Sequence, residues 1–290
     1  MKRFVAESIV GTTLAGTRRY RLLQLLRSGG VAHVYLAETD AQEKVAVKLL
    51  RPELETRRDV VARFEREALA ACRIRHENVL HVFEPVQRAG MFAFFSAEHL
   101  VGVDLADVLA SQGKLPAWRA VRTIVHAAAG LGAAHEAGVV HRDVKPENIF
   151  LVHLPDGREQ VKVLDFGSAS LASDPSPPFD KRITMTTEVV GTPGYAAPEQ
   201  AEGEPVRPSA DLYALGVVLY EALSGKPPFA ATNWLELLSL HARVPIKIPS
   251  GLSPALSAVL ARCLEKKPED RFAGMAELAD ALRAVPEHKG

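Results

Sequence analysis

Alternating apolar and polar positions in the first hundred residues predict a series of short β-strands. Ser28, Gly29 and Gly30 lie between two of these stretches, which is typical of a hairpin with glycine at its tip. The strands are predicted over residues 20–26, 33–37, 44–50, 79–85 and 91–97. Such closely spaced strands indicate an antiparallel sheet in the N-terminal third of the chain.

A helix is predicted over residues 59–72, where apolar residues recur at helical spacing. Glu67 borders this apolar stripe. In the preceding strand, alternation places Lys48 on the same face as Ala46, at a position where an apolar residue is expected. The pattern therefore puts a lysine and a glutamate at the edge of the predicted core.

Helical patterns dominate the rest of the chain. Residues 118–137 predict a long alanine-rich helix, and residues 212–223 predict a buried one that is shorter than the ~20 residues needed to span a bilayer. Between them, residues 151–164 predict a hairpin around Pro155-Asp156-Gly157. The strands of the first hundred residues are thus followed mainly by predicted helices.

The segment His141-Arg142-Asp143-Val144-Lys145-Pro146-Glu147-Asn148 concentrates polar chemistry in eight residues. Pro146 lacks an N–H donor and excludes a helix interior, so we expect a loop. A predicted strand leads soon afterwards into Asp165-Phe166-Gly167. Two carboxylates and an Asn beside a lysine suit a divalent cation with oxygen ligands and a phosphate.

Composition narrows the class of protein. The 290 residues include 35 basic and 35 acidic side chains, so no overall charge favours binding to nucleic acid or to an anionic membrane. Cys72 and Cys263 are the only cysteines, which favours reduced thiols over a disulfide framework. The N-terminus lacks the apolar run of an export signal. We therefore expect a cytoplasmic protein without a membrane segment.

The pairing of the His141–Asn148 loop with Asp165-Phe166-Gly167 resembles the catalytic core of eukaryotic-like serine/threonine protein kinases, and most resembles the bacterial ones. Three later segments fit the same family: 191–199, with its Ala-Pro-Glu anchor, 211–216 and 267–272. The resemblance covers roughly residues 20 to 285. It implies an α+β protein with a bilobal fold, in which a small antiparallel β lobe carries one main helix and a larger lobe is mostly helical.

The resemblance also implies boundaries. It places the small lobe at 20–100 and the large lobe at 101–285, with tails at 1–19 and 286–290. Within the large lobe, Asp211 is expected to hold the backbone of the catalytic loop, and Arg271 is expected to be the buried partner of Glu199.

The same resemblance implies a role for each catalytic residue. Lys48, oriented by Glu67, would bind the α- and β-phosphates of ATP. Asn148 and Asp165 would hold Mg²⁺, or Mn²⁺ in its place. Asp143 would accept or orient the substrate hydroxyl, Lys145 would neutralise charge on the γ-phosphate, and Thr192 together with Lys145 indicates the Ser/Thr-specific branch. The implied partner is a protein with a Ser or Thr acceptor.

The nucleotide site is implied in the same way. Its predicted residues are Ser28, Gly29 and Gly30 over the phosphates, Val34 and Ala46 above the adenine, Phe150 or Ile149 below it, and the backbone of Glu98 and Leu100 at its edge. The family's glycine pattern falls on Arg27, Gly29 and Ala32, so only its middle glycine is present. The residue before Glu98, Ala97, would be the gatekeeper, although strand alternation alone leaves Ser96 open.

Regulation is predicted on the segment 168–190. Arg142 precedes the catalytic Asp143 directly, where its guanidinium suits a phosphate on the activation segment. Thr184 and Thr186 resemble the paired activation threonines of bacterial kinases, and their phosphorylation in trans would require self-association.

Two other functions are compatible with parts of the pattern. A pseudokinase that binds nucleotide or acts as a scaffold would explain the depleted glycine loop. A small-molecule kinase of related fold would lack the segment 191–199. The sequence leaves the protein substrate and the activating signal open.

Overall fold

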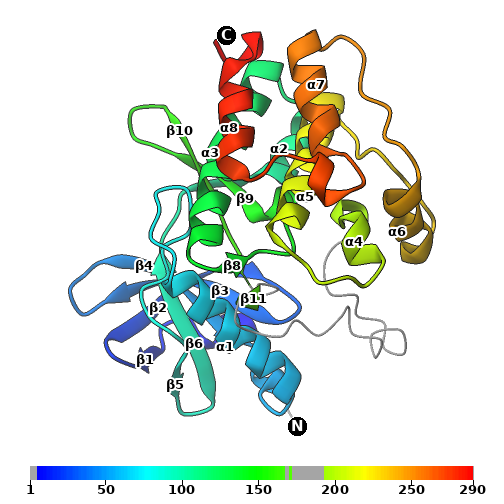
Figure 1. The fold of residues 1–290 in the computed structure, drawn as a ribbon. Helices are drawn as coiled ribbons and strands as arrows, with labels where there is room; N and C mark the ends of the chain where they lie inside the picture. Colours follow the sequence, from blue (N-terminus) through cyan, green and yellow to red (C-terminus); the bar gives the residue numbers. More distant parts are fainter. Residues whose placement is uncertain (1–4, 167–169, 172–192, 290) are drawn as a thin grey trace. The chain divides into compact units, whose positions relative to one another are not determined.

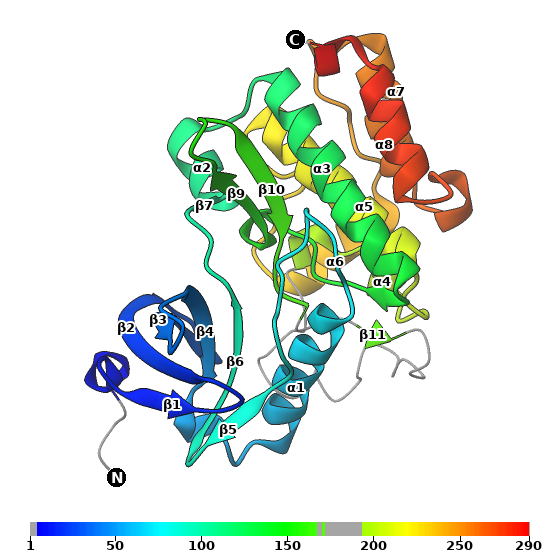
Figure 2. The same cartoon turned by 90° about the vertical axis from the view of Figure 1, so that its left-hand side faces the viewer.

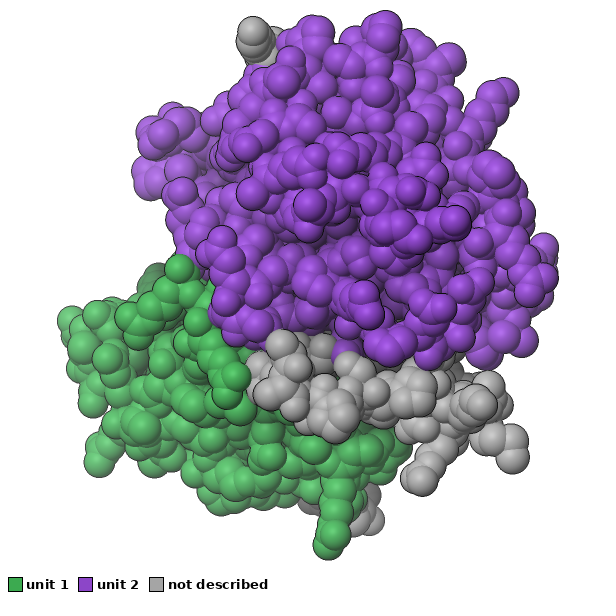
Figure 3. Space-filling view, viewed as in Figure 1, with its two compact units in different colours: residues 1–75, 80–101, 165–167 green, residues 76–79, 102–164, 168–290 purple. Residues whose placement is uncertain are grey.

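The computed structural model describes residues 5–166, 170–171 and 193–289. It divides into two compact units, coloured separately in Figure 3. Unit 1 comprises Met1–Arg75, Leu80–Val101 and Asp165–Gly167, and unit 2 comprises His76–Val79, Gly102–Leu164 and Ser168–Gly290. The predicted Thr184, Thr186 and Thr192 lie outside the described residues.

Unit 1 is built on a six-stranded antiparallel sheet with the order β1-β2-β3-β4-β6-β5. Its main helix, α1 (Arg58–Cys72), lies beside this sheet (Figure 2), and Phe64 of the helix packs against Phe95 of β6 with ring centroids 5.1 Å apart. The strands are β1 (Thr13–Ala15), β2 (Arg19–Ser28), β3 (Ala32–Thr39), β4 (Lys44–Leu50), β5 (Gln87–Ala89) and β6 (Phe92–Glu98), and a 3-10 turn, η2 (Pro52–Leu54), follows β4.

Strand alternation decides which residues of unit 1 enter its core. Val45, Val47 and Leu49 of β4 are buried in a cluster with Tyr20 and Phe94. The residues between them in sequence lie on the opposite, half-buried face. This alternation confirms the predicted strand 44–50 and places Lys48 on the face away from the core cluster.

The predicted strand over residues 79–85 differs from the structure. Residues 79–85 are not a regular strand, because only isolated bridges form, at Val79 and Val82. His81 N donates to the carboxylate Oε1 of Glu98 at 2.8 Å, so a side chain replaces part of the ladder there, and Pro85 has no N–H to donate.

Within the predicted tail 1–19, the described residues 5–19 contribute to the sheet. A 3-10 turn, η1 (Ala6–Ile9), precedes β1, which pairs with β2, and Leu14 of β1 is only 1% exposed. Tyr35 also donates its hydroxyl to Ala6 O at 2.8 Å. Burial of Ile9 and Leu14 gives this segment the apolar contacts that hold it on the sheet.

Unit 2 is mostly helical (Figure 1). α5 is buried along nearly its whole length, and the long α3 packs against α5, α8 and β10. The helices are α2 (Leu105–Gln112), α3 (Ala117–Glu136), α4 (Pro198–Ala201), α5 (Pro208–Ser224), α6 (Trp234–Arg243), α7 (Pro254–Cys263) and α8 (Met275–Ala284). The family's α+β architecture is therefore confirmed, with a β-rich unit and a helical one.

Unit 2 also contains short strands and 3-10 turns. A three-stranded sheet has the order β10-β9-β7, and β11 pairs with β8. The strands are β7 (Gly102–Asp104), β8 (Val139–Val140), β9 (Ile149–His153), β10 (Glu159–Val163) and β11 (Ser170–Leu171), and the turns are η3 (Pro146–Asn148), η5 (Pro193–Tyr195), η6 (Pro268–Asp270) and η7 (Pro286–Lys289).

The C-terminal residues also differ from the predicted tail. Glu287 of η7 accepts hydrogen bonds from Ser253 N (3.0 Å) and Ser253 Oγ (2.9 Å), and Ser253 Oγ in turn caps α7 by accepting from Leu256 N. None of the helices in the described ranges combines the length and the apolar composition needed to cross a bilayer.

Candidate active site

The predicted ion pair between Lys48 and Glu67 is present in unit 1, where Lys48 Nζ donates to Glu67 Oε1. Burial alone would lower the pKa of Lys48, but the carboxylates of Asp165 and Glu67 outweigh it and raise this pKa to about 12. Burial raises the pKa of Glu67 to about 7, against the attraction of Lys48. Lys48 therefore stays a cation at neutral pH, and the charge on Glu67 depends on pH near neutrality.

Asp165 joins this group from a strained backbone position. Its carboxylate Oδ1 lies 3.9 Å from Lys48 Nζ, and its side chain is 46% exposed. Its φ of 58° is in the left-handed region, which few residues other than glycine adopt and which is often found at functional sites. Phe166, which follows, is 2% exposed. Three charged groups that the sequence separates widely are thus brought together.

The sheet register places Ala97 and Ser96, the two candidates for the predicted gatekeeper, on opposite faces of β6. Ala97 of β6 lies opposite Ala46, and Ser96 lies opposite Val47. Ser96 Oγ donates to the hydroxyl of Tyr20 at 3.2 Å on the core face. Ala97 is therefore on the same face as Ala46, whereas Ser96 lies on the core face, and the gatekeeper role of Ala97 stays a prediction.

In unit 2, Asp211 of α5 organises the catalytic loop as predicted. Its Oδ1 accepts from Arg142 N and its Oδ2 from His141 N, both at 2.8 Å. His135 Nε2 lies 2.8 Å from the same Oδ2. Burial opposes ionisation, but the hydrogen bond from His135 and the charges and N–H groups around it lower the pKa of Asp211 overall. Arg142 has a φ of 68°, so this carboxylate stabilises a strained backbone.

The loop arranges the side chains around Asp143. Lys145 Nζ donates to Asp143 Oδ2 at 2.8 Å, and Asn148 Nδ2 donates to Asp143 O, also at 2.8 Å. His141 Nδ1 accepts from Asp143 N at 3.2 Å, while its Nε2 lies 2.9 Å from Leu164 O. The structure therefore brings Asp143, Lys145 and Asn148 into one hydrogen-bonded group.

A buried ion pair anchors the segment after residue 192. Arg271 donates from Nη1 and Nη2 to the two carboxylate oxygens of Glu199, at 2.7 and 2.9 Å, and its side chain is fully buried. Gln200 next to it donates to Arg142 O at 3.4 Å. This confirms the predicted partner of Glu199 and links α4 to the catalytic loop.

Sequence reasoning missed His135 and gave no supporting role to His141, which it named only as part of the loop motif. His135 and His141 lie six residues apart, at the end of α3 and the start of the loop, and both contact Asp211. No local pattern distinguishes them from ordinary polar residues, because their partners lie about 70 residues away in the sequence. Only the family motif singles out His141.

The remaining predicted residues are divided between the units. Ser28, Gly29, Gly30, Val34, Ala46, Glu98 and Leu100 belong to unit 1, whereas Phe150 belongs to unit 2, on β9. Asn148 and Asp165 are divided in the same way. The adenine site and the metal site therefore stay predictions.

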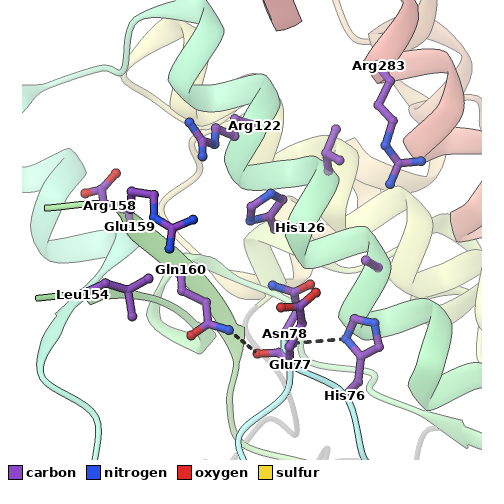
Figure 4. Close-up of a pocket in the computed structure, with 12 residues that line it drawn as sticks. His76, Glu77, Asn78, Arg122, His126, Leu154, Arg158, Glu159, Gln160 and Arg283 are labelled. Atoms are coloured by element: carbon purple, nitrogen blue, oxygen red, sulfur yellow. Dashed lines mark hydrogen bonds between the residues drawn. The ribbon is translucent and has the colours of Figure 1, made fainter. Parts of the chain in front are cut away.

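A hollow of about 500 Å³ in unit 2 contains none of the predicted site residues (Figure 4). It is lined by residues 76–78, by α3, by the β9–β10 hairpin and by Arg283 of α8. Three of the charged residues that line it are in ion pairs: Arg158 with Asp156, Arg283 with Asp280, and Glu159 with an arginine of α3. We assign no ligand to this hollow.

The fold and the catalytic loop together define a protein kinase domain. Residues 20–282 match the protein kinase domain family, and the chain belongs to this family. It is 36% identical over 274 residues to serine/threonine-protein kinase PknB of Mycobacterium tuberculosis, covering 91% of this chain and 42% of PknB. It is also similar to serine/threonine-protein kinase Pkn1 of Myxococcus xanthus (40% over 283 residues, 95% and 40%).

A third relative is the serine/threonine-protein kinase drp72 of Corynebacterium efficiens, which is 38% identical over 272 residues. That match covers 92% of this chain and 50% of the relative. The chain thus spans two fifths to one half of the length of these three relatives.

Proposed function

We propose that this chain is an ATP-dependent protein kinase that transfers the γ-phosphate to Ser or Thr hydroxyls of proteins. The observation that carries the proposal is the group around Asp143, in which a carboxylate, a lysine and an asparagine are fixed on one loop by Asp211. Three bacterial relatives that carry the name serine/threonine-protein kinase support it.

Phosphoryl transfer depends on positioning and charge neutralisation, and each residue can be given a task. Lys48, held by Glu67, binds the α- and β-phosphates. Asp143 orients the substrate hydroxyl and accepts its proton. Lys145, 2.8 Å from Asp143, neutralises charge on the γ-phosphate as the phosphoryl group moves. Each of these tasks uses a group whose partner in the structure already holds it in place.

Asn148 and Asp165 provide the hard oxygen ligands that Mg²⁺ requires, and Mn²⁺ accepts the same ligands. Asn148 Nδ2 is engaged with Asp143 O at 2.8 Å, which directs the amide so that Oδ1 is the oxygen available to a cation. When bound, the metal ion would neutralise charge on the phosphates.

The adenine is proposed to contact Val34, Ala46 and Phe150, with the backbone of Glu98 and Leu100 as its hydrogen-bonding edge. Val34 and Ala46 lie on the half-buried face of the sheet, which supports an apolar surface for a nucleobase.

The pseudokinase alternative is not supported. The described charged residues that transfer requires are all present, and their contacts are formed: Lys48 with Glu67, and Asp143 with Lys145. The depleted glycine loop is the only feature in its favour, and the loop contributes less to the barrier than these charges do.

Regulation and location are also proposals. Phosphorylation of Thr184 or Thr186, with Arg142 as the phosphate-binding residue, would activate the enzyme, and transfer in trans would require self-association. Thr192 is proposed to belong to the Ser/Thr-specific site. The two free cysteines support action in the reducing cytoplasm.

The test is transfer of labelled γ-phosphate from Mg-ATP to the chain itself and to a generic basic protein. We expect label on Ser and Thr after acid hydrolysis, because Lys145 and Thr192 resemble the Ser/Thr-specific pattern. Label on Tyr alone, or nucleotide binding with no transfer under conditions in which PknB is active, would contradict the proposal.

A further inference from the structure

The turn between β2 and β3 directs three consecutive carbonyl groups toward protein donors. Gly29 N donates to Ala32 O at 2.9 Å, Arg51 N donates to Val31 O at 3.0 Å, and Arg51 Nη1 lies 3.4 Å from Gly30 O. In a trans peptide the N–H and C=O groups point in opposite directions. The N–H groups of Val31 and Ala32 therefore face away from Arg51, as adjacent donors of the kind that binds phosphate oxygens.

Arg51 is itself held in position. Its Nε donates to Glu53 Oε1 at 3.0 Å and its Nη2 to the same oxygen at 2.5 Å. The two side chains are only 30% and 34% exposed. A guanidinium fixed by a carboxylate can hold a carbonyl with less loss of side-chain entropy than a free one.

A second contact braces the stems of the hairpin. Ser28 Oγ and His33 Nδ1 are 3.0 Å apart, and these two residues lie opposite each other on β2 and β3. His33 is 5% exposed and packs edge-on against Tyr35, on the face of β3 opposite to Val34. Burial and the nearby Arg51 lower the pKa of His33, so the contact is made by a neutral imidazole at pH 7.

The glycines of this turn differ in what they allow. A Cβ on Gly29 would lie 3.1 Å from Ala32 O, whereas a Cβ on Gly30 would meet nothing within 4 Å. A side chain on Gly29 would therefore be tight against the backbone that closes the turn. A side chain on Gly30 would not, so the turn is shaped by contacts more than by glycine content.

We propose that Arg51, supported by the Ser28–His33 contact, is a positioning residue that holds the N–H groups of Val31 and Ala32 toward the phosphates of ATP. This inference rests on the proposed function. It explains how a loop with one of the family's three glycines can still cover a nucleotide. Side chains on the face of the sheet opposite to Val34 fix the backbone, and they leave free the face on which the nucleotide is proposed to lie.

The test is the dissociation constant of Mg-ATP, measured by calorimetry, which does not require transfer. Arg51→Met should weaken binding about three- to tenfold, the scale of the net contribution of one ordinary hydrogen bond. The kcat at saturating ATP should stay within about twofold of the native value. Arg51→Lys should restore part of the affinity, because its ammonium can also donate to Gly30 O.

The matched control is Arg18→Met, which removes an exposed arginine that pairs with Glu43 at 3.2 Å in the same unit. It should leave the affinity for Mg-ATP unchanged. Unchanged affinity in Arg51→Met would overturn the inference. So would a lower melting temperature with no recovery of affinity in Arg51→Lys, which would indicate a purely structural role.

Failure of the proposed function would give a different result. A native chain that does not bind Mg-ATP contradicts the proposed function before any variant is made. A native chain that binds Mg-ATP without transferring phosphate contradicts transfer alone, and the affinity of Arg51→Met still decides the inference about the loop.

Discussion

Replacing Asp211 by Asn tests how the catalytic loop is held. The carboxylate accepts from Arg142 N through Oδ1, and from His141 N and His135 Nε2 through Oδ2. An amide has one acceptor oxygen and one donor nitrogen. Whichever way the Asn side chain is turned, its NH₂ group meets a backbone N–H of the loop, so one buried donor loses its partner.

The expected cost follows from these contacts. An unsatisfied buried donor costs about 1–3 kcal/mol, and the other bonds to the side chain lose the strength that a full charge gives them. We therefore expect Asp211→Asn to lower the free energy of unfolding by about 2–4 kcal/mol. Because Arg142 has a φ of 68°, the loop should relax to an unstrained backbone and displace Asp143, so transfer should fall more than ATP affinity.

Two measurements check this prediction. Urea unfolding gives the loss of stability, and amide hydrogen exchange reports on the N–H groups of His141 and Arg142 directly. Asp280→Asn is the control, because Asp280 is 76% exposed and its ion pair among the described residues is with Arg283 on the same helix; it should change stability by under about 0.5 kcal/mol. Undiminished protection of both amides in Asp211→Asn would refute the reasoning.

Three further predictions concern other parts of the site. Arg271→Met should lower the free energy of unfolding in urea by about 3–5 kcal/mol, because it leaves the Glu199 carboxylate buried without its cation. The control Arg262→Met, at a side chain 45% exposed, should lower it by under about 1 kcal/mol. Equal losses would contradict the assigned burial. With a pKa of about 7, Glu67 is mainly charged above that pH, so kcat/KM for ATP should fall as the pH drops through about 7. Glu67→Gln should lose this acid limb of the pH profile. An unchanged acid limb in the variant would show that another group causes it. Native enzyme should use N6-benzyl-ATP, because Ala97 is a small residue on the same face as Ala46. Ala97→Met should abolish use of this analogue while ATP turnover continues. Equal rejection of the analogue by both enzymes would mean that the space beside Ala97 is filled.

The elements that sequence predicted well are those with a strong local pattern. β4, α1 and α3 lie within a residue or so of their predicted bounds, because alternation and helical spacing depend only on neighbouring residues. Glu67 next to Lys48 could be predicted from its place at the edge of the apolar stripe combined with the family motif. The contact itself is long-range, and only the structure provides it.

The errors have long-range causes. Residues 79–85 look like a strand, but the side chain of Glu98 takes the hydrogen bond from His81 N that a neighbouring strand would take. The N-terminal β1 has only three residues, too few for a pattern, and it forms because β2 offers a free edge. His135 acquires its role only when α5 brings Asp211 to it, so no local pattern could have indicated that role.

The central claim is that Asp143 is the residue that handles the substrate hydroxyl. The most direct test compares Asp143→Asn with native enzyme for two quantities, the dissociation constant of Mg-ATP and the rate of phosphate transfer at saturating ATP. We predict similar ATP affinity and transfer lowered by about 10²–10⁴, the usual contribution of a positioned acid–base group. Transfer at the native rate by folded Asp143→Asn would contradict the claim.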